Sequence, residues 1–385
     1  MPGRNLNTLC IFCLYDKEGV VDDYVFCLIK ELRTYSTRLF VVVNGSIQRP
    51  YRELIIELSD DYLERDNQGF DAGAYYDVLL NEIMRDELER YNEIILCNDT
   101  FFGFFGGLEK VFSEMDQREC DFWGLSGHIQ SLFPYIQSYF MVFRKGIIKE
   151  NLLVSYFEKY VDSTSDNLND VYAQFEKGIF DYLTRKKGKR YSIYVEPQEY
   201  SVYNSAIYYL SEKGLPILKT KVFDSSKYPS LYHMRCCIKY VLHYTSYNVD
   251  YILRHIKRKY NIEFTQDEIE SVDLTKLPEK YKIFEPRNSA EEILNFVGND
   301  RFYIYGTGMF GSMLYWRIGL NNPMFLGFIV SDYQFCDEAK YEHRIYKFSE
   351  IEDVVSAKIV IATNAEIAKE IIKQFPNRNN LIQIY

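Results

Sequence analysis

The stretch from Asn67 to Thr100 constrains this chain most, because it places a glycine-containing turn shortly before a buried strand that ends in polar residues. The turn is Asn67–Gly73, and the strand is Glu93–Cys97, followed at once by Asn98-Asp99-Thr100. Glycines let a backbone approach a ligand closely, and open α/β sheets bind ligands at the carboxyl ends of their strands. The stretch therefore predicts an α/β domain with a nucleotide-sugar site, where Asp99 meets a metal-bound diphosphate.

Strand and helix patterns alternate over the first 227 residues. Strands are predicted at Leu9–Leu14, Arg38–Val43, Ile55–Leu58, Glu93–Cys97, Phe122–Leu125, Tyr139–Phe143 and Tyr191–Val195. Helices are predicted at 22–33, 72–90, 150–160 and 169–186. Such alternation is typical of a mainly parallel sheet with covered faces, and we expect an α/β N-terminal domain with a mixed, mainly parallel sheet over residues 1–227.

The remainder predicts a helical connector and linker at 228–287 and a small Rossmann-like domain at 288–385. There, the strand Phe302–Tyr305 runs into a Gly-x-Gly-x-x-Gly turn, a helix and a second strand, Phe325–Val330, with an acidic residue shortly after it. The candidate residues for a nucleotide or NAD-like ligand are Gly306, Gly308, Gly311 and Asp332. About 95 residues are few for a complete dehydrogenase, so a domain that only keeps the fold is the alternative.

Length and charge limit the classes of function. A chain of 385 residues with 47% hydrophobic residues can build two domains. Its formal net charge of −10 argues against a general nucleic-acid binder, which needs a basic surface. No apolar run approaches the roughly 18 residues of a membrane span, and the N-terminus lacks a signal-peptide pattern. We expect a cytoplasmic protein, with the inner face of the membrane as a second location.

Five separated motifs carry a resemblance to a known family. They are Asn67–Gly73, Asn98–Thr100, Asp121–Gly124, Gln137–Phe140 and Gly214–Lys219. Their order and spacing, over roughly residues 6 to 225, resemble the rhamnan synthesis protein F family of bacterial polysaccharide glycosyltransferases. The resemblance implies an enzyme with a GT-A-like fold that transfers a sugar, often rhamnose, from a nucleoside diphosphate such as dTDP-rhamnose. The acceptor would be a glycan or lipid-linked glycan of the cell surface.

Sugar transfer requires that the departing diphosphate be neutralised by a divalent ion or by basic side chains. Asp99 is the candidate ligand for Mg or Mn, and both Asn98 and Asp99 are candidate donor contacts. Families with the GT-A fold usually show Asp-x-Asp here, whereas this chain has Asn98-Asp99-Thr100 and so one strong oxygen ligand. Asp71 could hold a ribose or sugar hydroxyl, or cap a helix. Lys219 could face the diphosphate or be a solvated lysine.

Two further donor contacts are expected. Asn67 could contact the base or the backbone, and Asp16, after the first strand, could seat the nucleotide or be an ordinary turn residue.

The transfer also requires a base for the acceptor hydroxyl. Glu176 takes the place of the first acid in a motif that, in similar glycosyltransferases, precedes a helix and a glycine by a similar distance. The alternative is that Glu176 is an ordinary exposed glutamate of a helix. His128 is the other candidate for base or acceptor contact. We expect inversion at the sugar carbon, because one base suffices and no second nucleophile stands out.

The sequence also allows two other functions and predicts one contact surface. A nucleotide-sugar oxidoreductase would work through the turn at 306–311, and a non-catalytic scaffold for polysaccharide assembly would explain the missing second aspartate. The basic stretch 254–259 on an acidic chain predicts peripheral membrane contact. A solvated helix end that complements its dipole is the alternative.

Overall fold

The computed structural model describes most of the 385 residues. The described ranges are 6–128, 134–195, 201–228, 230–278, 288, 290–319, 322–332, 344–351, 356–363, 365–375 and 379–384. Within these ranges, no helix is both long and apolar enough to cross a membrane.

The chain forms two compact units. The first unit comprises 1–128, 136–166 and 182–283, and the second comprises 129–135, 167–181 and 284–385. Helices of the predicted connector thus belong to the first unit, and a short helical stretch from the middle of the chain belongs to the second.

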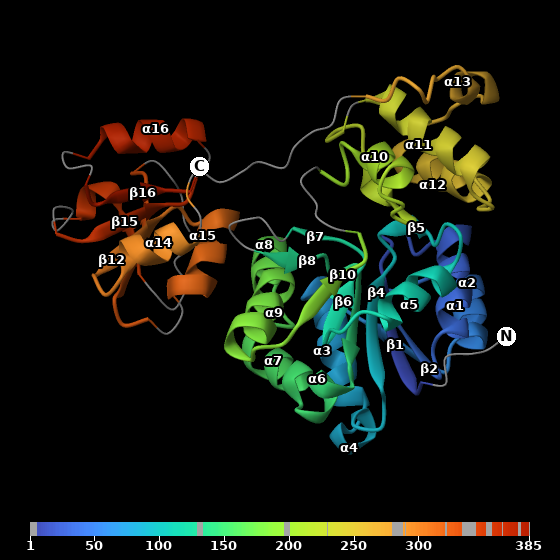
Figure 1. Cartoon of the computed structure of the whole chain (residues 1–385), viewed down its shortest axis with the longest axis horizontal. Coiled ribbons are helices and arrows are strands. Elements are labelled where there is room, and N and C mark those ends of the chain that lie inside the picture. The colour runs from blue at the N-terminus through green and yellow to red at the C-terminus, as the bar shows by residue number, and fades with distance from the viewer. Residues whose placement is uncertain are drawn as a thin grey trace. The chain divides into compact units, whose positions relative to one another are not determined.

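The first unit is built on a seven-stranded mixed sheet in the order β10-β6-β9-β4-β1-β2-β3 (Figure 1). Its strands are β1 Thr8–Leu14, β2 Arg38–Asn44, β3 Asp61–Arg65, β4 Glu93–Asn98, β6 Phe122–Gly124, β9 Phe140–Arg144 and β10 Tyr191–Ile193. Strand β9 is antiparallel to both of its neighbours, and the other pairs are parallel. All seven residues of β1 are buried, as expected for a central strand covered on both faces. The mixed, mainly parallel sheet expected from the sequence is confirmed.

Helices cover this sheet on both sides. They are α1 Asp23–Thr34, α2 Arg49–Leu58, α3 Phe70–Asp77, α4 Arg85–Leu88, α5 Leu108–Asp116, α6 Lys145–Lys149 and α7 Leu152–Tyr160. Helix α10 Ala206–Ser211 instead packs against the later helix Leu231–Tyr244. Successive side chains of β1 point to opposite faces. Cys10, Phe12 and Leu14 pack in one core with Leu28 and Leu32 of α1, whereas α3 lies against β1 and β2 with a buried face of its own.

Shorter elements complete the first unit. They are the pair β5 Phe101–Gly103 with β11 Ile217–Lys219, strand β7 Gly127–His128, the π-helical turns Val78–Glu82 and Tyr182–Lys186, and the 3-10 turn Thr220–Phe223. The short strand β8 Tyr135–Ile136 has its first residue in the second unit. Helices α11 Leu231–Tyr244, α12 Asp250–Tyr260 and α13 Gln266–Glu270 pack together, and their buried side chains join the core of α1 and β1.

Two predicted elements were wrong. Residues Ile55–Leu58 end helix α2 rather than form a strand, because Pro50 starts a helix whose apolar residues Tyr51, Leu54, Ile55 and Leu58 have helical spacing. The predicted helix 72–90 is interrupted at Ile83, which is buried with extended backbone between the π-helical turn and α4.

The second unit contains a five-stranded, all-parallel sheet in the order β14-β13-β12-β15-β16. Its elements are α8 Leu168–Val171, α9 Gly178–Asp181, α14 Ala290–Val297, β12 Phe302–Tyr305, α15 Met309–Leu314, β13 Phe325–Val330, β14 Ile345–Lys347, β15 Lys358–Ile361, α16 Ala365–Lys373 and β16 Leu381–Gln383, with π-helical turns Tyr172–Lys177 and Tyr315–Gly319 and the 3-10 turn Phe348–Glu350.

Side chains of β12 alternate between two cores. Phe302 and Ile304 pack with the side of α14 and α15, and Tyr303 and Tyr305 pack with α16. Numbered by their own order in the chain, the five strands run 3-2-1-4-5, the doubly wound order of Rossmann folds without a sixth strand. The α/β class and the Rossmann-like C-terminal fold expected from the sequence are confirmed.

Candidate functional site

Two neighbouring strands of the first unit end at the same edge of the sheet. Strands β1 and β4 are paired in parallel, with Cys13 opposite Asn98, so Tyr15 and Asp99 follow them side by side. The Tyr15 backbone N–H donates to Asp99 Oδ2 at 3.3 Å. The Tyr24 hydroxyl of α1 donates to the Asp99 carbonyl at 2.8 Å. Burial raises the pKa of the Asp99 carboxyl to about 7, so this group exchanges its proton near neutral pH.

A chain of hydrogen bonds connects Asp71 to Lys219 through the end of β4. Asn98 Nδ2 donates to Asp71 Oδ2 at 2.9 Å, and Asn98 Oδ1 accepts from the Thr100 hydroxyl at 2.7 Å. Lys219 Nζ donates to Thr100 Oγ1 at 2.5 Å and lies 4.1 Å from the centroid of the Tyr139 ring. Lys219 is only 5% exposed. Three predicted donor contacts, Asp71, Asn98 and Lys219, are therefore brought together from distant parts of the sequence.

The carboxylate of Asp71 is held within this chain of contacts. Burial raises the pKa of Asp71, while the hydrogen bond from Asn98 and the charge of Lys219 act to lower it. Its Oδ1 atom also accepts from the Ala72 backbone N–H at 3.0 Å in the first turn of α3. Asp71 thus stabilises the start of the helix and orients Asn98.

Packing within the protein requires the glycines of the first motif, and the ligand approach expected from the sequence stays a prediction. Gly69 has a left-handed φ of +64°, and a Cβ there would lie 2.6 Å from the Ser163 carbonyl oxygen. A Cβ at Gly73 would lie 2.4 Å from the carbonyl oxygen of Gln68. By contrast, Asn67 Oδ1 is buried and has no hydrogen-bond partner among the described residues. A buried acceptor of this kind is costly unless a water or ligand satisfies it.

Asp16 is occupied by cations from α12. Arg258 Nη2 and Lys259 Nζ lie 2.9 and 3.0 Å from Asp16 Oδ2. The pKa of Asp16 is lowered: burial acts to raise it, and the hydrogen bonds from these two cations outweigh that effect. The predicted role of Asp16 in seating a nucleotide stays a prediction, and the structure gives it a structural role as well.

The rest of the basic stretch 254–259 also pairs with acids of the first unit. The ion pairs are Arg254 with Asp23, Arg258 with Asp22, and Lys257 with Glu263, and His255 Nδ1 lies 2.6 Å from Asp22 Oδ2. These contacts account for the cluster without a lipid surface, and the membrane contact stays a prediction.

The two candidate bases lie in different units. His128 is the last residue of β7 in the first unit and is 8% exposed. Glu176 lies half-buried on the π-helical turn 172–177 of the second unit, next to Lys177, whose pKa burial lowers to about 8. Both roles stay predictions.

The C-terminal candidates lie around the end of β12. Gly306 follows this strand with a φ of +108°, Gly308 precedes α15, and Gly311 lies in its first turn. Asp332 follows β13, and its Oδ1 accepts from the Ser349 backbone N–H at 2.9 Å. A cavity of about 510 Å³ opens beside Gly306 and Gly308.

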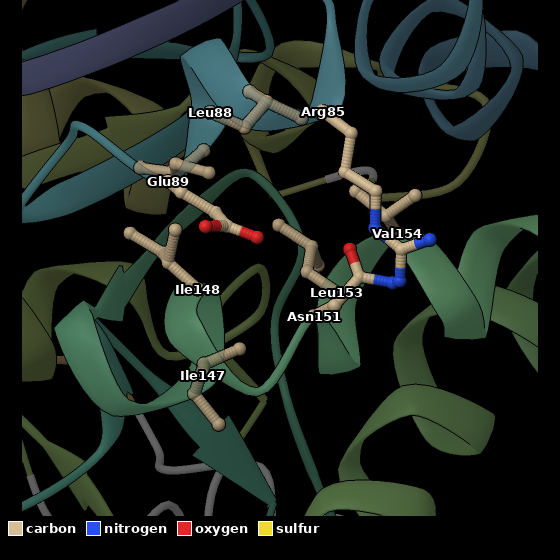
Figure 2. A pocket seen from close by; sticks show the side chains of 9 residues that line it. Arg85, Leu88, Glu89, Ile147, Ile148, Asn151, Leu153 and Val154 are labelled. Atoms are coloured by element: carbon tan, nitrogen blue, oxygen red, sulfur yellow. The ribbon is translucent and has the colours of Figure 1, made fainter.

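The described residues contain no group of three or more His, Cys, Asp and Glu side chains placed to hold a metal ion. Mg²⁺ needs less than a full protein cage, because it binds through one or two carboxylates together with substrate phosphates. Asp99 could supply one such carboxylate, provided that it loses the proton that its raised pKa lets it keep up to about pH 7. A second hollow, between α4 and α6, is lined by Leu88, Ile148 and Val154 (Figure 2) and holds only about 10 Å³, too little for a sugar nucleotide.

Two residues of this edge were missed as candidates. Thr100 connects Asn98 to Lys219, and the Tyr24 hydroxyl holds the Asp99 backbone carbonyl. Thr100 belongs to a motif quoted for the family resemblance, which was the available signal. Nothing in the local sequence of Tyr24 marks its contact 75 residues away.

Comparison with known proteins places these motifs in context. The family model for rhamnan synthesis protein F matches residues 39–287. Virulence protein VirA of Vibrio anguillarum is 25% identical over 195 residues, which cover 49% of this chain and 60% of that protein. The chain therefore spans less than two thirds of this relative's length.

Two solved structures align at low similarity. The apo-form glycosyltransferase GlyE of Streptococcus pneumoniae aligns with a TM-score of 0.34 and 12% identity, over 98% of this chain and 91% of that chain. Core-mannan synthase A of Aspergillus fumigatus, in a Mn/GDP form, aligns with a TM-score of 0.25 and 8% identity, over 41% of this chain and 64% of that chain. The family model spans more than half of this chain, and the chain belongs to the rhamnan synthesis protein F family.

Proposed function

We propose that this protein is a glycosyltransferase that moves a sugar from a nucleoside diphosphate to a bacterial cell-surface polysaccharide. Membership in the rhamnan synthesis family supports polysaccharide synthesis as the setting. The observation that carries the proposal is the buried chain of contacts from Asp71 through Asn98 and Thr100 to Lys219, at the carboxyl edge of the sheet beside Asp99. Rhamnose, from dTDP-rhamnose, is the sugar we propose.

In the proposed reaction, an acceptor hydroxyl attacks the anomeric carbon while the bond from that carbon to the diphosphate oxygen breaks. The hydroxyl proton passes to a base, for which Glu176 and His128 are the candidates, and the configuration inverts. Negative charge grows on the leaving diphosphate, and a preorganised cation stabilises it most where water is excluded. Lys219 is such a cation, because Thr100 and the Tyr139 ring hold its ammonium group away from solvent.

A divalent ion bound at Asp99 would add further charge neutralisation to the same diphosphate. Ionised Asp99 would be its protein ligand. The Tyr15 backbone N–H and the Tyr24 hydroxyl, which both donate to Asp99, hold that residue in place. Removal of divalent ions with a chelator tests this part separately from the role of Lys219.

The experiment is transfer from dTDP-rhamnose and, in parallel, from UDP-glucose and UDP-galactose to a rhamnan acceptor. Product is followed by mass spectrometry and by release of nucleoside diphosphate. Lys219→Met should lower turnover about 10²-fold or more, the loss typical of one electrostatic group. Lys213→Met, at an exposed lysine, is the matched control. The proposal fails if no donor releases its diphosphate in the presence of acceptor, or if both variants keep full turnover.

A further inference from the structure

The second unit carries a cavity that the proposed transfer reaction does not use. Strand order changes direction at β12, whose neighbours are β13 on one side and β15 on the other. The cavity of about 510 Å³ lies at the carboxyl ends of these three strands, beside Gly306, Ser331 and Thr363. Doubly wound sheets bind their ligands at this switch point, and the volume is typical of small-molecule sites.

The three glycines of the turn have different physical reasons to be glycine. Gly306 has a φ of +108°, which other residues rarely adopt. At Gly311 a Cβ would lie 1.9 Å from the Gly306 carbonyl oxygen, so only glycine lets the helix pack on the turn.

Gly308 has neither reason. Its φ of −72° suits any residue, and a Cβ there would lie more than 4 Å from every atom of the described residues. The space beside Gly308 is open and belongs to the cavity. Close approach of a ligand to the backbone is the remaining reason for a glycine, and it is the role of the second glycine in dinucleotide-binding turns.

A buried hydroxyl supplies independent evidence for a ligand. Tyr305, the last residue of β12, is 2% exposed and lines the cavity. Its Oη has no hydrogen-bond partner among the described residues. An unsatisfied buried hydroxyl costs free energy unless a ligand or water completes its bond.

The other described lining residues indicate the kind of ligand. Glu370 of α16 is the one charged residue among them, and Phe310, Ile367 and Ile371 supply apolar surface. Ile367 is 51% exposed, an apolar side chain at the rim of the cavity. A lining with one carboxylate disfavours a triphosphate, whereas backbone N–H groups of a glycine turn can hold a diphosphate.

The carboxylate that faces the cavity differs from the one expected. Asp332 lies at the end of β13, is bonded to the Ser349 backbone, and is absent from the described lining. Glu370 Oε1 accepts from Lys373 Nζ at 2.6 Å, and the Glu370 side chain, 69% exposed, lines the cavity.

We propose that the second unit binds a nucleoside diphosphate group, with the diphosphate against Gly308 and the nucleoside toward Tyr305 and Glu370. Two kinds of molecule contain this group, a dinucleotide such as NAD⁺ and a free or sugar-linked nucleoside diphosphate. Binding here is separate from donor binding in the first unit.

Calorimetric titration of the full chain with NAD⁺, ADP, dTDP and dTDP-rhamnose tests the site. We expect at least one ligand to bind wild type and Lys219→Met equally, and to bind Gly308→Val about ten-fold or more weakly, because the valine fills the approach to the turn. Tyr305→Phe should weaken the same ligand by roughly two- to ten-fold, the effect of one hydrogen bond. Tight NAD⁺ binding with weak dTDP binding would identify a dinucleotide, and the reverse a nucleoside diphosphate.

The thermal unfolding of Gly308→Val should stay close to wild type, since the Cβ that it adds meets none of the described residues within 4 Å. Three results would overturn the proposal. They are no binding of any of the four ligands at millimolar concentration, equal binding by wild type and Gly308→Val, and binding that only Lys219→Met removes.

Discussion

Replacement of Asp99 by asparagine should stabilise the first unit at alkaline pH, although the same change is expected to weaken donor binding. Burial raises the pKa of Asp99 from its ordinary value of 3.8 to about 7. Between these two values the folded state holds a proton that the unfolded state has released. The free energy of unfolding therefore falls as the pH rises from about 4 to about 7, and the full cost persists at higher pH.

The size of the effect follows from the shift. About three pKa units correspond to about 4 kcal/mol at the limit, at 1.36 kcal/mol for each unit. The Asp99 side chain is half-buried rather than sealed, so solvent screening reduces the expected gain to about 1–4 kcal/mol. Asparagine cannot ionise, and its side-chain oxygen can still accept from the Tyr15 backbone. The variant should then gain stability at pH 8 and gain nothing near pH 4.

Urea unfolding in a Trp316→Phe background measures this difference. The chain has two tryptophans, and Trp123, fully buried in β6, then reports the first unit alone. Asp86→Asn, at an exposed aspartate, is the control. Equal midpoints for Asp99→Asn and wild type at pH 8 would refute the claim that the buried carboxylate is held at a cost. If Asp99→Asn is more stable than wild type at pH 8 but binds the donor more weakly in calorimetry, the ionised carboxylate lowers stability and contributes to ligand binding.

Three more outcomes follow from the contacts above. Gly69→Ala should unfold at lower urea than Gly188→Ala, because both glycines have φ near +65° but only the first would place its Cβ 2.6 Å from the Ser163 carbonyl oxygen. Arg258→Met should lower the free energy of unfolding by about 1–3 kcal/mol, since it removes the guanidinium that the partly buried carboxylates of Asp16 and Asp22 share. Glu176→Gln should lower turnover about 10²-fold or more with unchanged donor affinity if this residue is the base, and more than about a tenth of the turnover would place the base elsewhere.

The sequence predicted the central strands well and the sheet edge poorly. Strands β1, β2 and β4 are apolar runs buried on both faces, so their pattern is unambiguous. The edge strand Asp61–Arg65 is half-buried throughout, and its side chains form ion pairs such as Arg38 with Asp61 and Arg52 with Glu64. A strand held by charge pairs carries no apolar signal, and the nearby Ile55–Leu58 was mistaken for it.

For the candidate site, the sequence identified residue types but not their partners. Asn98 and Asp71 were each predicted as donor contacts, and the sequence did not show that Asn98 donates a hydrogen bond to Asp71. The contact of Asp16 with Arg258 spans 242 positions, and no local pattern marks it. The catalytic base is harder to predict from the sequence, because Glu176 belongs to the second unit whereas the predicted donor contacts lie in the first.

The glycines show why a motif needs the space around it before it indicates a ligand. Gly73 and Gly311 come from two motifs that each suggest phosphate binding, yet a Cβ at either would strike a carbonyl oxygen of the protein itself. Selection for packing explains both. Gly308 has an ordinary φ and open space, so neither packing nor conformation requires it. In the first unit, the evidence for a ligand therefore comes from the buried Asn67 oxygen and Lys219 rather than from glycines, and in the second it comes from Gly308 and Tyr305.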